Sequence, residues 1–180
     1  AISYSEKEAA LKEVFGEQYG SNFDDPVLFQ RWVCYSPAVK SFYRREFPLI
    51  SRTLFAEAVY RRRPTYNQTV LDDFVALVEK KIDDIKTLLQ LRSSQMAKIL
   101  RDNGINGTAY YMHPAEKLVP IIAGGARQYI NVLTLLDTAY TLAGSAVLNG
   151  VITSKQRKEM ELLCRKAVRA FSAKIGRAHV

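Results

Sequence analysis

The sequence has 180 residues, of which 48% are hydrophobic and 24% are charged, and its formal net charge is +8. This composition excludes a disordered chain and is sufficient for one sizeable core or two small ones. We identify no apolar run of the ~20 residues that a membrane span requires, so we expect no membrane partner. The excess of basic residues favours a polyanionic partner.

The two cysteines predict neither a disulfide framework nor a metal site. Cys34 and Cys164 lie far apart and lack metal-ligand spacing, which is typical of reduced thiols in a cytoplasmic protein. We find no leader in which a basic segment is followed by an apolar one. Because the chain starts without a methionine, loss of a leader from this sequence is left as an alternative. Residues 175–180, IGRAHV, look like a translated sequencing adapter, and we leave them out of the fold prediction.

The first predicted elements are a short helix and a strand. Ser5 and Glu8 form a capping-box pattern, which predicts a helix to about Tyr19 and makes residues 1–25 a lead-in helix and linker. Residues 27–35, VLFQRWVCY, are rich in β-branched and aromatic side chains and predict a strand. A solitary strand leaves backbone donors and acceptors open, so it requires a partner.

Two helices are predicted to follow the strand. Ser36 is placed as an N-cap with Pro37 at the first helical position, and Pro48 is predicted to end this helix. Ser51 is then predicted to cap a second helix with the sequence RTLFAEAVYRRR.

The second half of the chain predicts three helices and a hairpin. A long helix is predicted from about Gln68 to Asp102, and its apolar seam requires a long partner within the chain or across a dimer. Residues 108–122 predict a hairpin that turns at 113–116, with its second arm confined to a sheet edge by Pro120. Helices over about 126–148 and 153–174 follow.

The order strand, helix, helix resembles the ribbon-helix-helix DNA-binding fold. The matching residues are VLFQRWV, SPAVKSFYRREF and PLISRTLFAEAVYRR. In that family the strand pairs with the same strand of a second subunit, and the resulting ribbon enters the major groove. The resemblance implies a mainly α fold with a short β-ribbon, a homodimer, a DNA-binding unit at residues 26–66 and a helical domain at 67–174.

The resemblance also assigns DNA-binding roles. Arg31 is predicted to point outward because burial favours Trp32 and Leu28, with Gln30 at the ribbon margin or in a buried hydrogen bond. The helix start at Ser51, Arg52 and Thr53 is predicted to offer open N–H groups to a phosphate. The other predicted phosphate contacts are basic residues: Arg44, Arg45, Arg61, Arg62, Arg63, Lys155, Arg157 and Lys158.

Three other features each leave alternatives open. The last helix has seven basic residues against two acidic ones, and this face, which includes Arg165, Lys166 and Arg169, is either a second phosphate-binding strip or a solvated surface. Asp137 is either a buried, paired carboxylate or the edge of a polar stripe, and the pattern favours the stripe. The arginines of residues 27–63 are either DNA contacts or solvated charges around an ordinary core, and the pattern favours neither interpretation.

The order of elements over residues 27–173 resembles AcaB-like regulators of conjugative plasmids and integrating conjugative elements. The motifs that carry this likeness are LDDF, LLDTAYTLA and CRKAVRAF. The resemblance implies a DNA-binding transcriptional regulator of transfer genes, with double-stranded DNA as its partner.

Enzyme chemistry is not indicated. We find no phosphate-binding glycine loop, zinc-hydrolase pattern or Ser-His pair, so we expect no catalytic residue, metal, cofactor or small-molecule ligand. His113, beside Pro114, is interpreted as a surface turn residue. The alternative function is a helical scaffold or assembly protein of a conjugation system, which would use the long helix for partner contacts without binding DNA.

Overall fold

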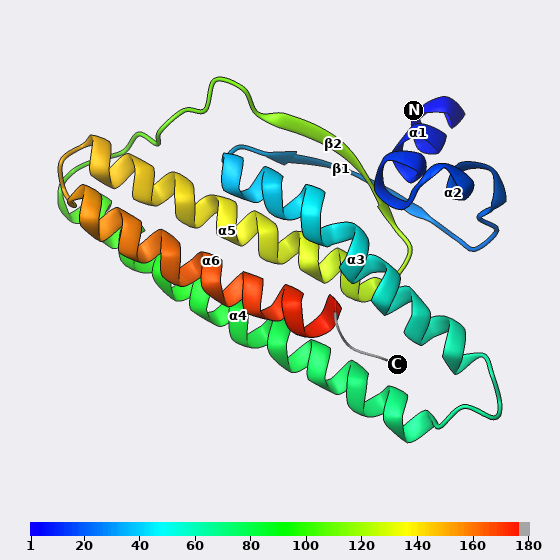
Figure 1. Cartoon of the computed structure of the whole chain (residues 1–180). Helices are drawn as coiled ribbons and strands as arrows, with labels where there is room; N and C mark the ends of the chain where they lie inside the picture. Colours follow the sequence, from blue (N-terminus) through cyan, green and yellow to red (C-terminus); the bar gives the residue numbers. More distant parts are fainter. Residues whose placement is uncertain (177–180) are drawn as a thin grey trace.

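The structure is a computed structural model that describes residues 1–176, with the side chains of residues 20–22 left out. Within that range it is mainly helical, with a two-stranded antiparallel sheet (Figure 1). The elements in chain order are α1 (Tyr4–Phe15), α2 (Glu17–Asn22), β1 (Leu28–Cys34), α3 (Pro37–Arg61), α4 (Gln68–Asp102), β2 (Ala115–Ile121), α5 (Gly124–Leu148) and α6 (Ser154–Gly176).

Helix α5 is the centre of the fold and packs against α3, α4 and α6 (Figure 1). It is long and apolar enough to cross a membrane, but 61% of its most apolar stretch is buried inside the protein. Its central position therefore accounts for its apolar composition. The main core takes buried side chains from β1 and α3 as well as from α4 to α6, so it is continuous across residue 66.

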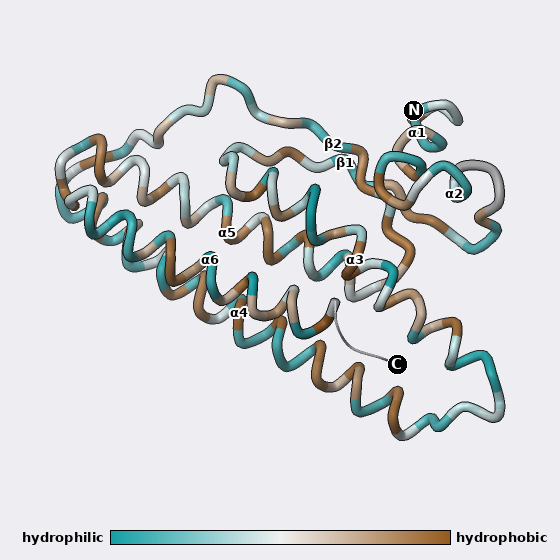
Figure 2. Tube along the Cα trace, viewed as in Figure 1, coloured by the Kyte–Doolittle hydropathy of each residue, from teal (hydrophilic) through white to brown (hydrophobic). Residues whose placement is uncertain are grey.

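The long helix α4 is confirmed from Gln68 to Asp102. Asn67 caps its start, because the Asn67 side chain accepts hydrogen bonds from the N–H groups of Thr69 and Val70. Hydrophobic and hydrophilic residues alternate along α4 (Figure 2), and its apolar seam is buried against α5 and α6. The long partner is therefore within the chain.

The predicted helix pair is wrong, because α3 is one helix of 25 residues with Pro48 inside it. Proline removes one helical hydrogen bond, at a cost of about 3 kcal/mol. Phe47 and Ile50 on either side of Pro48 are fully buried in the core, and each contributes roughly 1.5–3 kcal/mol through that burial. Core packing thus outweighs the local stop signal.

The predicted strand partner is also wrong. Strand β1 pairs antiparallel with β2 of the same chain, with Leu28 opposite Ile121 and Cys34 opposite Ala115. The predicted hairpin within residues 108–122 is not present, because only its second arm forms a strand, and that arm pairs with β1. Trp32 of β1 and Val119 of β2 are buried in one core, and this pairing requires no association with a second molecule.

Pairing within the chain leads to a crosslinking prediction. We expect the double variant Arg31→Cys/Leu118→Cys to form a disulfide within one molecule, because the two positions are opposite in the β1–β2 register. Non-reducing gel electrophoresis should show a monomer that migrates faster than its reduced form. A disulfide-linked dimer of the single variant Arg31→Cys, with no intramolecular bond in the double variant, would instead indicate pairing between two chains.

The connection from β1 to α3 is held by Asp137 of α5. One carboxylate oxygen of Asp137 accepts a hydrogen bond from the N–H of Tyr35 at 2.8 Å. The other accepts from the N–H of Ser36 at 2.9 Å and from the Ser36 hydroxyl at 2.7 Å. Asp137 is only 5% exposed. It is therefore a buried, paired carboxylate, and the polar-stripe interpretation that the pattern favoured is wrong.

The helix ends give mixed outcomes for the predicted caps. The capping box of α1 uses Ser3 and Glu6, two residues before the predicted pair. The predicted pair of Thr153 and Gln156 is confirmed at the start of α6, with hydrogen bonds in both directions. Of the supposed adapter residues, 175 and 176 lie in α6, and 177–180 lie outside the described residues.

Both cysteines are buried, free thiols. Burial, assisted by the charge of Asp137, raises the pKa of Cys34 to about 11, so its thiol stays protonated at neutral pH. Burial also raises the pKa of Cys164. Neither is placed as a reactive nucleophile.

Candidate nucleic-acid interface

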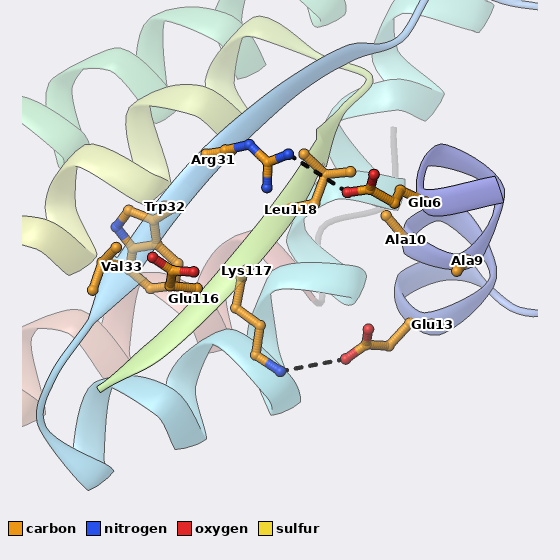
Figure 3. Close-up of a pocket in the computed structure, with 10 residues that line it drawn as sticks. All are labelled: Glu6, Ala9, Ala10, Glu13, Arg31, Trp32, Val33, Glu116, Lys117 and Leu118. Carbon is orange, nitrogen blue, oxygen red and sulfur yellow. Dashed lines mark hydrogen bonds and ion pairs between the residues drawn. The ribbon is translucent and has the colours of Figure 1, made fainter. Parts of the chain in front are cut away.

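The outward face of β1, predicted to read bases, lies against α1. Arg31 points outward and Trp32 is buried, as predicted, whereas Leu28 is 53% exposed instead of buried. The Arg31 guanidinium is 3.5 Å from the Glu6 carboxylate of α1 (Figure 3). Gln30 is half-buried. The structure therefore places no open, polar reading face on this strand.

A second ion pair connects α1 to the sheet. The Lys117 ammonium of β2 is 3.5 Å from the Glu13 carboxylate of α1 (Figure 3). Between the two ion pairs, α1 and the sheet enclose a cleft of ≈ 380 Å³. Helix α1 thus lies beside the sheet and engages Arg31 and Lys117, while Val33 and Tyr35, which continue the outward face of β1, stay exposed.

The predicted phosphate-binding helix start does not exist. Ser51 is fully buried in the middle of α3, and the Thr53 hydroxyl donates to the carbonyl of Leu49. Their backbone N–H groups lie within a continuous helix and are used by its own hydrogen bonds. Of these three predicted residues, Arg52 alone is exposed.

The arginines at the end of α3 have partners within the chain. Arg61 pairs with Glu57 at 2.6 Å and with Asp72 at 2.8 Å. Arg62 pairs with Asp25 at 2.8 Å. These ion pairs connect the end of α3 to α4 and to the segment before β1, whereas Arg63 lies over the ring of Tyr60. The charges of Arg61 and Arg62 are partly neutralised by these ion pairs, which weakens the two side chains as phosphate ligands.

Three other arginines of α3 are open. Arg44, Arg45 and Arg52 are exposed, and none has an ion pair with a carboxylate in the described part of the chain. Spacings of seven and eight residues place Arg45 and Arg44 on the same side of the helix as Arg52. The middle of α3 therefore presents a line of guanidinium groups without ion pairs among the described residues.

Helix α6 extends this positive surface. Arg165 and Arg169 of α6 line a groove of ≈ 340 Å³ together with Arg45 of α3. Glu46 also lines the groove and is the one acidic group there among its lining residues. Lys158 is exposed and lies seven residues before Arg165, which places it on the same stripe of α6.

We call these residues the cationic row; its members are Arg44, Arg45, Arg52, Lys158, Arg165 and Arg169. Of the other two residues predicted in α6, Lys155 is exposed beside the row, whereas Arg157 is held by Glu161 at 2.8 Å. Sequence reasoning missed the convergence of Arg45 with α6, because it depends on how α3 and α6 pack. The sequence pattern that pointed to this surface was the helical spacing of the basic residues in α6.

The row has the chemistry of a phosphate-binding surface. Guanidinium groups donate several hydrogen bonds in a fixed plane, and phosphate oxygens accept them in pairs. Among the described residues, no group of three His, Cys, Asp or Glu side chains is placed to hold a metal ion. The surface is therefore suited to hold a polyanion at equilibrium.

Comparison with known proteins supports the fold. No protein-family model matches the chain, and no curated protein matches its sequence. The crystal structure of AcaB from uropathogenic E. coli is similar, with a TM-score of 0.78 and 25% sequence identity. The similarity covers 84% of this chain and 78% of the AcaB chain. The chain therefore has an AcaB-like fold.

Proposed function

We propose that the protein is a DNA-binding transcriptional regulator of conjugative transfer or other mobile-element genes. It acts in the cytoplasm and holds double-stranded DNA. The observation that carries the proposal is the cationic row on two packed helices, in which every arginine except the half-buried Arg165 is exposed. None of these arginines has an ion pair with a carboxylate within residues 1–176. The AcaB-like fold supports it, since the sequence likeness to AcaB-like regulators implies the same role.

The proposed contact is with the phosphate backbone. Because β1 already pairs with β2, the proposal no longer uses a ribbon made from two chains. In this proposal the row, which spans two packed helices, contacts successive phosphates of the duplex. Contacts of this kind position a protein on DNA, and sequence preference then comes from other contacts and from DNA shape.

The scaffold alternative loses its main support in the structure. It relied on the apolar seam of α4 as a surface for partner proteins. Leu71, Ile82 and Leu89 of that seam are buried against the rest of the same chain. The seam is therefore occupied, and the open surface of α3 and α6 combines the cationic row with the exposed side chains of Leu49, Leu162 and Leu163.

The test is the salt dependence of duplex binding. We expect the full chain to bind a labelled random duplex of ~30 base pairs, with an affinity that falls linearly with salt on logarithmic axes. If four or more cations each contact a phosphate, the slope is roughly −4 or steeper. Fluorescence anisotropy between about 50 and 300 mM salt measures it. Absence of binding at the lowest salt would contradict the proposal.

The regulatory role requires a second measurement. Immunoprecipitation of DNA crosslinked to the protein, in cells that carry the mobile element, should enrich sequences upstream of transfer genes. Deletion of the coding sequence should change the transcript levels of those same genes. Uniform recovery of DNA with unchanged transcripts would indicate a packaging protein instead of a regulator.

A further inference from the structure

Two large apolar side chains project from the segment between α4 and β2. Tyr110 is 83% exposed and Met112 is 74% exposed. Tyr111 between them is half-buried, so inward and outward side chains alternate as in an extended chain. The segment therefore turns one aromatic ring and one thioether toward solvent.

The segment is held in place at three points. The N–H of Ala109 donates to the Ser145 hydroxyl at 2.6 Å, and the ring of Tyr111 lies 6.5 Å from that of Tyr35. The carbonyl of His113 accepts from the Lys40 ammonium at 2.5 Å. Exposure of Tyr110 and Met112 is thus a property of an anchored segment.

The contact with Lys40 places this segment beside the cationic row. Lys40 lies on α3 one helical turn before Arg44, and both line the groove between α3 and the sheet. The apolar projection therefore lies near two cations, Lys40 and Arg44, in a groove that Lys117 and its partner Glu13 also line.

We propose that Tyr110 and Met112 form a wedge that contacts the bases of the duplex held by the cationic row; this inference rests on the proposed function. Proteins that hold DNA through phosphates insert apolar side chains at base steps, and aromatic rings stack on unstacked bases. The neighbouring cations favour a nucleic acid over an apolar protein partner. Two side chains are also far less than a stable protein interface requires.

The test compares two double variants of the full chain. Tyr110→Ala/Met112→Ala removes the wedge, and Val70→Ala/Leu91→Ala removes two exposed apolar side chains of α4, which has no member of the row. We expect the wedge variant to lose about tenfold or more in duplex affinity, and the control to lose less than about twofold. The salt slope of both should equal that of the wild type, because no phosphate contact is lost.

A spectroscopic readout separates insertion from a simple surface contact. In a duplex that carries 2-aminopurine, the wild type should raise the fluorescence by unstacking the base, and the wedge variant should not. Equal affinity of all three proteins without a fluorescence change would overturn the wedge and leave the proposed function intact. Failure of the wild type to bind any duplex would overturn the proposed function itself. Unchanged duplex affinity, together with loss of binding to phosphatidylglycerol vesicles, would assign the segment to a membrane surface instead.

Discussion

Replacement of Asp137 by alanine is expected to lower the free energy of unfolding by about 3–5 kcal/mol. The carboxylate accepts three hydrogen bonds, from the N–H groups of Tyr35 and Ser36 and from the Ser36 hydroxyl. Hydrogen bonds to a charged acceptor each contribute about 1.5–3 kcal/mol, and the donors left in the buried site would lose their partner. The position of α3 relative to α5 depends on this contact.

Urea unfolding, followed by circular dichroism, measures this change. The control is Thr138→Ala, because Thr138 is exposed on the next position of α5 and its hydroxyl bonds only to the Thr134 carbonyl. We expect the control to change the free energy of unfolding by no more than about 0.5 kcal/mol. A loss below about 1 kcal/mol for Asp137→Ala would contradict the role of the carboxylate in joining β1 and α3 to α5.

Elements that depend on local pattern could be predicted from the sequence. Helix α4 begins and ends as its apolar spacing indicates, and the capping box at Thr153 starts α6 one residue later. Strand β1 and the burial of Trp32 follow from β-branched and aromatic alternation. Such features are decided within a few residues, so no knowledge of distant contacts is needed.

Features decided by distant contacts could not be predicted. Pro48 is a helix stop by local rules, and the core on both sides of it decides otherwise. The partner of β1 lies more than 80 residues away in sequence, and the donors to Asp137 lie about 100 residues before it. The hydrogen bonds between these donors and the carboxylate therefore could not be predicted from the local sequence pattern.

The candidate site shows the same division. Arg44 and Arg45 were identified as cations from the sequence, and both are open in the structure. Arg61 and Arg62 look the same as these two residues in the sequence. In the structure, however, Asp72 pairs with Arg61 and Asp25 pairs with Arg62. Which arginines stay unpaired depends on carboxylates from other segments, and only the folded chain shows that.

The second large effect is expected in DNA binding. The triple variant Arg44→Gln/Arg45→Gln/Arg169→Gln should lose on the order of 100-fold in duplex affinity at ~0.1 M salt. All three side chains are exposed and unpaired in the described part of the chain, so their replacement removes phosphate contacts without breaking an internal ion pair. Glutamine keeps helix propensity close to that of arginine, and we expect an unchanged unfolding transition.

A charge-matched variant separates a specific surface from overall basicity. Lys80→Gln/Lys98→Gln/Arg101→Gln removes three formal positive charges from exposed positions of α4. It also breaks the ion pairs of Lys80 with Asp84 and of Lys98 with Asp102, so its unfolding transition is measured beside that of the wild type. Long-range attraction depends on net charge and should fall equally in both variants, whereas direct phosphate contacts are lost only where the duplex lies.

The salt slope of these two variants, measured beside the wild type on one duplex, tests the role of the cationic row most directly. We expect the α3–α6 variant to bind with a slope that is shallower by roughly 2 to 3 than that of the wild type, and the α4 variant to keep the wild-type slope. Equal slopes for all three proteins, or a larger loss in the α4 variant, would show that DNA does not lie on α3 and α6.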